Sequence, residues 1–147
     1  MTPDEARSRF AAARVARLAT VGPDSAPHLV PVTFAVEGDR IVTAVDTKPK
    51  RGGRLRRLEN LDANARVCLL VDHYDEDWRA LWWVRADGRG RVLEAGPETE
   101  HAFELLRERY RQYASVELIG PAMVVEVERW TGWSADRGIG LAGLSVP

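Results

Sequence analysis

Disulfide bonds, long hydrophobic runs and a dominant charge are all missing from this sequence. Its 147 residues include a single cysteine, so no disulfide within the chain can hold the fold, which suits a reducing cytoplasm. That residue, Cys68, lies in the apolar run of residues 67–71 and is expected to be a small core residue. No apolar stretch approaches the roughly 18 residues that span a bilayer. We therefore expect a cytoplasmic protein with no membrane partner.

The charges nearly cancel, because 21 Lys and Arg face 22 Asp and Glu and leave a formal net charge of −1. The chain as a whole is therefore not expected to be attracted to nucleic acid. Hydrophobic residues make up 45% and charged residues 29%, which is typical of a globular protein. A chain of this length corresponds to about one domain. We expect one domain over residues 1–147, with its core at about 14–133 and a glycine-rich tail at 134–147.

Hydrophobic periodicity predicts a mainly β protein with peripheral helices. The strand-like segments are 17–21, 28–36, 40–45, 66–71, 81–84 with a continuation at 89–94, and 122–133. Helical patterns cover 3–13 and 97–113, and Tyr110 and Tyr113 fall on the apolar face of the second. A shorter helical pattern runs through Leu55, Leu58 and Leu61. Most connections are too short for parallel crossovers, which favours antiparallel pairing. The predicted architecture is a six-stranded antiparallel barrel, closed or half-closed.

A basic segment over residues 48–57 is the most unusual stretch. It holds six cations and no acid, among them Lys48, Lys50 and Arg57. Arginine presents a fork of donors suited to phosphate oxygens, and the paired glycines at 52–53 allow close backbone approach. The pattern favours an anion site, with a solvated helix face and a nucleic-acid contact as alternatives. Nucleic-acid binding is the weakest of the three, because no aromatic residue is interleaved for stacking.

Two further stretches have more than one interpretation. Residues 72–77 contain four acids and His73, yet they lack the glycine and closing glutamate of a calcium loop, so we expect a solvated turn. Trp82 and Trp83 are adjacent on a strand and must point to opposite faces. One can pack in the core while the other contacts a partner subunit or a flat ligand.

Side chains for nucleophilic or metal-dependent catalysis are poorly represented. No G-x-S-x-G or P-loop motif occurs, and the three histidines, His28, His73 and His101, are not at metal-ligand spacings. We therefore predict no catalytic side chain and no metal site. An anion site without a catalytic dyad indicates that the chemistry belongs to a bound cofactor.

The order of motifs resembles a known family. Residues 17–21, then Gly22-Pro-Asp-Ser-Ala-Pro-His28, then Pro31-Val-Thr-Phe34 resemble the opening of the pyridoxamine 5′-phosphate oxidase-like split-barrel proteins. The continuation through Lys48-Pro-Lys50, residues 57–67, Leu70-Val71-Asp72 and Trp78 resembles the actinobacterial branch that binds the deazaflavin coenzyme F420. The resemblance covers about residues 14–133. It implies a six-stranded split β-barrel and an obligate homodimer with cofactor sites at the subunit interface.

The resemblance also implies which residues bind the cofactor. Lys50, Arg54 and Arg57 match the basic residues that hold the cofactor phosphate, with Lys48 and Arg51 close enough to assist. The remaining matches are contacts from the barrel and from the partner edge: Thr43, Val45, Pro31, Thr33, and either Trp82 or Trp83. This chain has more basic residues than better-known members. It also lacks the C-terminal Arg/His signature of true pyridoxamine-phosphate oxidases, which argues against a vitamin B6 substrate.

The resemblance predicts an F420-dependent oxidoreductase that transfers a hydride between the deazaflavin and an unsaturated small organic molecule. An FMN-dependent oxidase or reductase of the same superfamily is the first alternative. A non-enzymatic flavin or haem carrier is the second.

Overall fold

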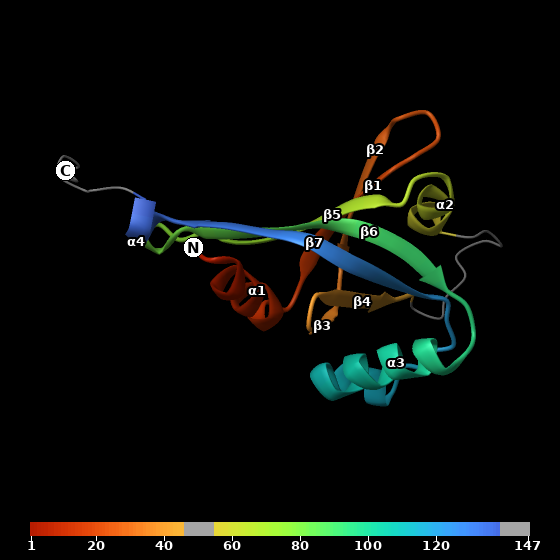
Figure 1. Cartoon of the computed structure of the whole chain (residues 1–147). Coiled ribbons are helices and arrows are strands. Elements are labelled where there is room, and N and C mark those ends of the chain that lie inside the picture. Colours follow the sequence, from red (N-terminus) through yellow and green to blue (C-terminus); the bar gives the residue numbers. More distant parts are fainter. Residues whose placement is uncertain (46–54, 139–147) are drawn as a thin grey trace.

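One antiparallel sheet of seven strands organises the computed structural model, which describes residues 1–45 and 55–138 (Figure 1). The strands are β1 (Ala16–Val21), β2 (Pro27–Val32), β3 (Ala35–Glu37), β4 (Arg40–Ala44), β5 (Arg66–His73), β6 (Trp82–Leu93) and β7 (Ala122–Ser134). Their order across the sheet is β2-β1-β5-β6-β7-β4-β3. The predicted mainly β, antiparallel architecture is confirmed, but the sheet has seven strands and not six.

The extra strand arises where the sheet closes on itself. Strands β2 and β3 lie at opposite edges of the sheet, yet only Thr33 and Phe34 separate them in the chain. Three peptide steps span at most about 11 Å, so the two edges must come together and the sheet curls into a barrel. The single strand predicted over 28–36 is therefore split, because its first half pairs with β1 and its second half with β4. Pro31 lies on the edge strand β2, where its missing N–H is tolerated.

The barrel interior is filled by one face of the strands and closed by two helices. Helix α1 (Pro3–Ala12) begins with the predicted capping box of Thr2 and Glu5 and inserts Phe10 into the core. The Phe10 ring lies 4.9 Å from that of Phe34 and 5.3 Å from that of Trp130, between centroids. Helix α2 (Arg56–Ala63) contributes Leu58 and Leu61. The buried strand residues of this core include Leu18, Val32, Ile41, Leu69, Val71, Val84 and Val125.

A second hydrophobic cluster lies between helix α3 (Pro97–Arg109) and the sheet. In Figure 1 this helix runs below β4. Phe103 and Leu106 of α3 pack there against Val42 of β4 and Val124 of β7. The one-turn helix η2 (Arg111–Ala114) continues α3 and adds Tyr113 to the cluster. The predicted helix at 97–113 is thus confirmed, with a change from α to 3₁₀ geometry near its end.

Strands β5, β6 and β7 are longer than the barrel needs. Their far ends extend past the other strands (Figure 1). At these ends η1 (Trp78–Ala80) connects β5 to β6, and α4 (Ala135–Gly138) follows β7. Trp78 at this tip is 66% exposed. Among the helices described, none is long and apolar enough to cross a membrane.

The hydroxyl group of Tyr110 joins three segments at the point of barrel closure. It accepts a hydrogen bond from the Phe34 N–H at 3.1 Å and one from Arg109 Nε at 3.2 Å. The carbonyl oxygens of Phe34 and Arg14 each lie 2.9 Å from it, so it can donate to one of them. These bonds tie α3 to the β2–β3 link and to the chain before β1. Tyr110 is only 5% exposed, so water has little access to them.

We predict that Tyr110→Phe lowers the free energy of unfolding by about 1–3 kcal/mol, because it leaves the buried Phe34 N–H without its partner. Urea denaturation monitored by circular dichroism measures the change. The control is Tyr74→Phe, which removes a hydroxyl from a side chain that is 64% exposed and should leave the unfolding curve unchanged. Equal curves for wild type and Tyr110→Phe would contradict the proposed role of this hydroxyl.

Candidate functional site

A cleft of about 750 Å³ opens where the two edges of the sheet meet. It is bounded by the chain before β1, the ends of β2 and β4, the start of α2, and η2. The residues that line it are Arg14, Val15, Pro31, Val32, Thr33, Thr43, Ala44, Val45, Leu55, Arg57, Tyr110, Gln112, Tyr113 and Val116. Apolar walls with a few convergent polar groups are typical of a small-molecule site.

Five of the predicted cofactor-binding residues line this cleft. Pro31 and Thr33 come from the end of β2 and the link that follows it, and Thr43 and Val45 come from the end of β4 and the residue after it. Arg57 comes from the first turn of α2. The β2 and β4 residues are near opposite edges of the sheet, so only barrel closure brings them together.

Thr43 supplies the clearest sign that a ligand belongs in the cleft. Its side chain is 2% exposed, and its Oγ1 has no hydrogen-bond partner among the residues described. A buried hydroxyl without a partner costs about 1–3 kcal/mol. The nearby Thr33 hydroxyl is satisfied, because its oxygen lies 2.6 Å from that of Tyr113. Thr43 therefore offers a hydrogen bond that the described part of the chain does not use.

Arg57 is held in place by the packing of α2 on the barrel. One turn further along this helix, Asn60 is 1% exposed and donates from Nδ2 to Thr20 Oγ1 of β1 at 3.0 Å. Leu58 packs in the barrel core beside it. These buried contacts fix the start of α2 against β1, and so they determine where Arg57 meets the cleft.

The other predicted phosphate ligands cannot be placed. Lys48, Lys50, Arg51 and Arg54 lie outside the described residues, in the gap from 46 to 54. Val45 and Leu55, the residues on either side of that gap, both line the cleft. The described chain on both sides of the gap therefore borders this site.

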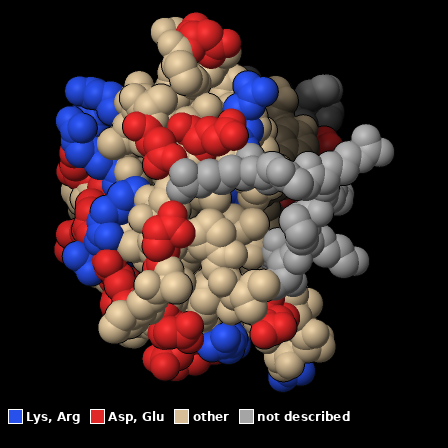
Figure 2. Space-filling model, turned by 90° about the vertical axis from the view of Figure 1, so that its right-hand side faces the viewer, with Lys and Arg blue, Asp and Glu red and all other residues tan. Residues whose placement is uncertain are grey.

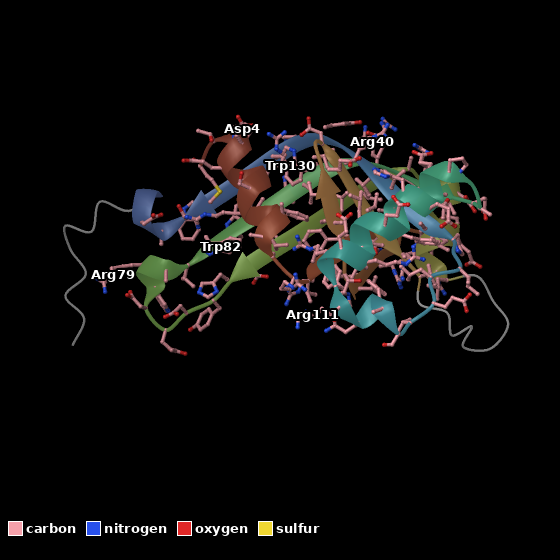
Figure 3. All side chains as sticks on the ribbon, turned by 90° about the horizontal axis from the view of Figure 1, so that it is seen from below. Asp4, Arg40, Arg79, Trp82, Arg111 and Trp130 are labelled. Carbon is pink, nitrogen blue, oxygen red and sulfur yellow. The ribbon has the colours of Figure 1, made fainter. Side chains whose placement is uncertain are left out.

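Trp82 and Trp83 do not line the cleft of this chain. They face opposite sides of the sheet, as expected for neighbours on a strand. Trp82 stacks on His73 with 6.1 Å between ring centroids, and the guanidinium of Arg9 lies 5.4 Å from its ring. In Figure 3 Trp82 lies near α1, well apart from Arg111 on η2. A cofactor contact by either indole stays a prediction.

The sequence did not predict that Tyr110, Tyr113 and Arg14 line the cleft. It assigned Tyr110 and Tyr113 only to the hydrophobic face of a helix, and it gave Arg14 no role. A buried tyrosine hydroxyl needs a polar partner, and two such residues three positions apart were an available signal. The two rings meet edge to face, with 5.8 Å between centroids.

Outside the cleft, the buried atoms His28 Nδ1 and Asn60 Oδ1 also have no hydrogen-bond partner among the described residues. Cys68 is half-buried, and burial raises the pKa of its thiol, which disfavours the reactive thiolate. The predicted turn over 72–77 is only partly right, because Asp72 and His73 end β5 and the exposed turn begins at residue 74. In this turn Asp77 accepts from the Arg79 N–H. No group of three or more His, Cys, Asp or Glu residues in the described ranges could hold a metal ion. On the face seen in Figure 2, acidic and basic side chains are interleaved.

Comparison with known proteins identifies the family. The family model of pyridoxamine 5′-phosphate oxidase matches residues 2–134, so the chain belongs to this family. Over 56 residues the chain is 39% identical to 5a,11a-dehydrotetracycline/5a,11a-dehydrooxytetracycline reductase of Streptomyces rimosus subsp. rimosus. That match spans 38% of this chain and 38% of the reductase.

Solved structures share the fold at low sequence identity. A conserved hypothetical protein of Mycobacterium tuberculosis superimposes with a TM-score of 0.74 at 23% identity, covering 100% of this chain and 92% of the other. An FAD-binding protein of Mesorhizobium loti gives 0.67 at 22% identity, with 90% and 94% covered. The haem storage protein HutZ of Vibrio cholerae gives 0.66 at 15% identity, with 91% and 95% covered. These likenesses establish the split-barrel fold.

We predict that Thr43→Val separates stability from binding. It removes the unpaired buried hydroxyl, so the free energy of unfolding should rise by about 1 kcal/mol. It should also weaken binding of a ligand that uses this hydroxyl by about 0.5–1.5 kcal/mol. Thermal unfolding and calorimetric titration with F420 or FMN measure the two effects.

The matched control is Thr131→Val, at a half-buried position that does not line the cleft. It should leave affinity for the cofactor unchanged. If Thr43→Val has full affinity for both cofactors, the hydroxyl is not a ligand contact.

Proposed function

We propose that this protein is an oxidoreductase that binds coenzyme F420 in the cleft at the barrel closure and transfers a hydride between it and an unsaturated small organic molecule. The observation that supports this most is the convergence of Pro31, Thr33, Thr43, Val45 and Arg57 on that cleft. In sequence alone, these residues match cofactor contacts of the split-barrel proteins. Their meeting at one concave site is what a shared cofactor position requires.

The residues of the cleft fit a phosphorylated, planar cofactor. The volume of about 750 Å³ falls in the range of small-molecule sites. The unpaired Thr43 hydroxyl can hydrogen-bond a polar ring edge, and the guanidinium of Arg57 suits a phosphate. Val45 and Pro31 supply apolar surface for the planar ring. When bound, the deazaflavin supplies the hydride chemistry that no side chain here provides.

The protein's part in the reaction is positional. Arg57, together with the unplaced Lys48, Lys50, Arg51 and Arg54, would hold the phosphate and so set how deeply the ring enters. Thr33, Thr43 and the apolar walls would fix the ring and exclude water from it. No side chain is assigned as a proton donor or acceptor in this scheme.

The two alternatives make different demands on the same cleft. FMN also carries a phosphate, but six cations exceed what one phosphate needs, whereas F420 adds a carboxylate-rich tail. A haem carrier most often ligates iron through His, Cys or Met, and none of the described residues lining the cleft is of these types. The lining therefore favours a deazaflavin or flavin over haem.

We predict that the wild-type protein binds F420 more tightly than FMN, and that Arg57→Ala weakens F420 binding by about 1.5–3 kcal/mol, the range for hydrogen bonds to charged groups. Isothermal titration calorimetry measures both. The control is Arg66→Ala, which removes the same side chain from an exposed position at the start of β5, outside the basic segment and the cleft. Arg66→Ala should keep wild-type affinity to within about twofold. Unchanged affinity in Arg57→Ala would remove its assignment, and tighter binding of FMN would favour the FMN alternative.

We also propose that the protein is a homodimer. The outer face of β1, β2, β5 and β6 has a mainly apolar hollow of about 670 Å³ beside Leu29, Leu70 and Trp83. Leu29 is 66% exposed there, and the Arg17–Asp72 and Arg85–Asp87 ion pairs lie beside these apolar side chains. An apolar centre with a polar rim is typical of a subunit interface.

We predict that Leu70→Lys converts the dimer into folded monomers, because it adds a third positive charge between its cross-strand neighbours Arg17 and Arg85 in the middle of this face. Light scattering should give twice the mass of one chain for wild type and the mass of one chain for the variant, with circular dichroism unchanged. Ile119→Lys, at a 65% exposed position on another part of the surface, should remain dimeric. A wild-type protein that is monomeric at micromolar concentration would refute the proposal.

A further inference from the structure

Arg14 differs from many other arginines of this protein in its partners. Several described arginines pair with a carboxylate, as in Arg7–Asp39, Arg40–Glu126 and Arg91–Glu98. Arg107 and Arg109, like Arg14, contact aromatic rings, but neither of them lines the cleft. Arg14 lines the cleft and forms no ion pair with any carboxylate of the described residues. Its charge is therefore left for something that enters the cleft.

The position of the Arg14 guanidinium is nevertheless fixed. Its Nη2 donates to the carbonyl oxygen of Arg109 at 2.9 Å, and its Cζ lies 4.5 Å from the centroid of the Tyr110 ring. Tyr110 is itself held by its hydrogen bonds to Phe34. A guanidinium carries five N–H donors, and these contacts use one of them. A cation that is positioned in advance loses little entropy when it binds an anion.

The surroundings of Arg14 indicate the shape of what it binds. The rings of Tyr110 and Tyr113 meet edge to face, and the Arg14 guanidinium lies on the first of them. Val15, the next residue after Arg14, also lines the cleft. Arg57, the proposed phosphate ligand, comes from α2 on a different wall. The cleft thus has two cationic points on separate elements, one of them next to aromatic side chains.

We propose that Arg14 is a specificity-determining residue, which binds an anionic oxygen (a carboxylate or an ionised enol) of a planar, unsaturated hydride acceptor. This rests on the proposed function, because it assigns the Tyr110 side of the cleft to the acceptor and the Arg57 side to the cofactor. An acidic, conjugated ring compound fits this side of the cleft, and a neutral compound of the same shape gains nothing from Arg14.

The test compares two probes that share one ring system. At pH 7 2-hydroxy-1,4-naphthoquinone is an anion, and 1,4-naphthoquinone is neutral. Equilibrium dialysis of the cofactor-free protein should show at least about tenfold tighter binding of the anion, since hydrogen bonds to a charged group exceed one factor of ten in affinity. In Arg14→Ala this preference should disappear, while affinity for the neutral quinone stays within about twofold of wild type.

Two further variants keep the test decisive. Arg14→Lys retains the positive charge but not the forked donors, so it should retain only part of the preference for the anionic quinone. It replaces Arg14→Ala in the test if that variant folds poorly. Arg111→Ala is the control, because it removes an exposed arginine of η2 that does not line the cleft, and its preference should equal that of wild type.

Separate F420 titrations distinguish this proposal from the proposed function. Wild type and Arg14→Ala should bind F420 equally. Weaker F420 binding in Arg14→Ala alone would assign Arg14 to the cofactor and overturn the proposal. Equal binding of the two quinones by wild type, including no binding of either, would also overturn it. Failure of F420 to bind any variant would refute the proposed function, whatever the quinones show.

Discussion

The two-residue link between β2 and β3 is the constraint on which the rest of this structure depends. It joins opposite edges of a seven-stranded sheet, so the sheet must curl until those edges meet. The ends of β2 and β4 then face each other, and the cleft forms between them. The Tyr110 hydroxyl binds Phe34 within this link. A single short connection thus determines both the barrel and the site.

The polar groups at this closure differ from those on the surface. Surface arginines such as Arg40 and Arg91 have carboxylate partners, whereas Arg14 at the cleft is bound by a carbonyl and a ring. The buried hydroxyl of Thr43 also lacks a partner among the described residues. The unpaired Thr43 hydroxyl reduces stability in the ligand-free protein, and both features are useful to a protein that binds a polar, charged ligand. Stability and binding are therefore expected to oppose each other at this site.

Much of this could be predicted from the sequence, because alternation of apolar residues and the basic segment are local signals. Pro31, Thr33, Thr43, Val45 and Arg57, which the family resemblance implies as cofactor contacts, line one cleft, and their contact with a cofactor stays a prediction. The break at Thr33–Phe34 was missed because periodicity continues across it, and only the pairing partners change. Tyr110 was assigned to packing alone because the partners of its hydroxyl lie 76 and 96 residues away in the chain. Trp82 and Trp83 were correctly placed on opposite faces of the sheet. Neither lines the cleft, because both lie at the start of the long strand β6, in the part that extends past the barrel.

The central claim is that a cofactor occupies the cleft formed by barrel closure. Titration of isotopically labelled protein with F420, followed by nuclear magnetic resonance, tests it most directly. The account predicts that the amide signals of Thr33, Thr43 and Val45 shift together with one binding curve, although these residues lie on separate parts of the chain. It predicts no change at Asp75, in the exposed turn at the far end of β5. Saturable F420 binding that leaves all three cleft amides unperturbed would contradict the account.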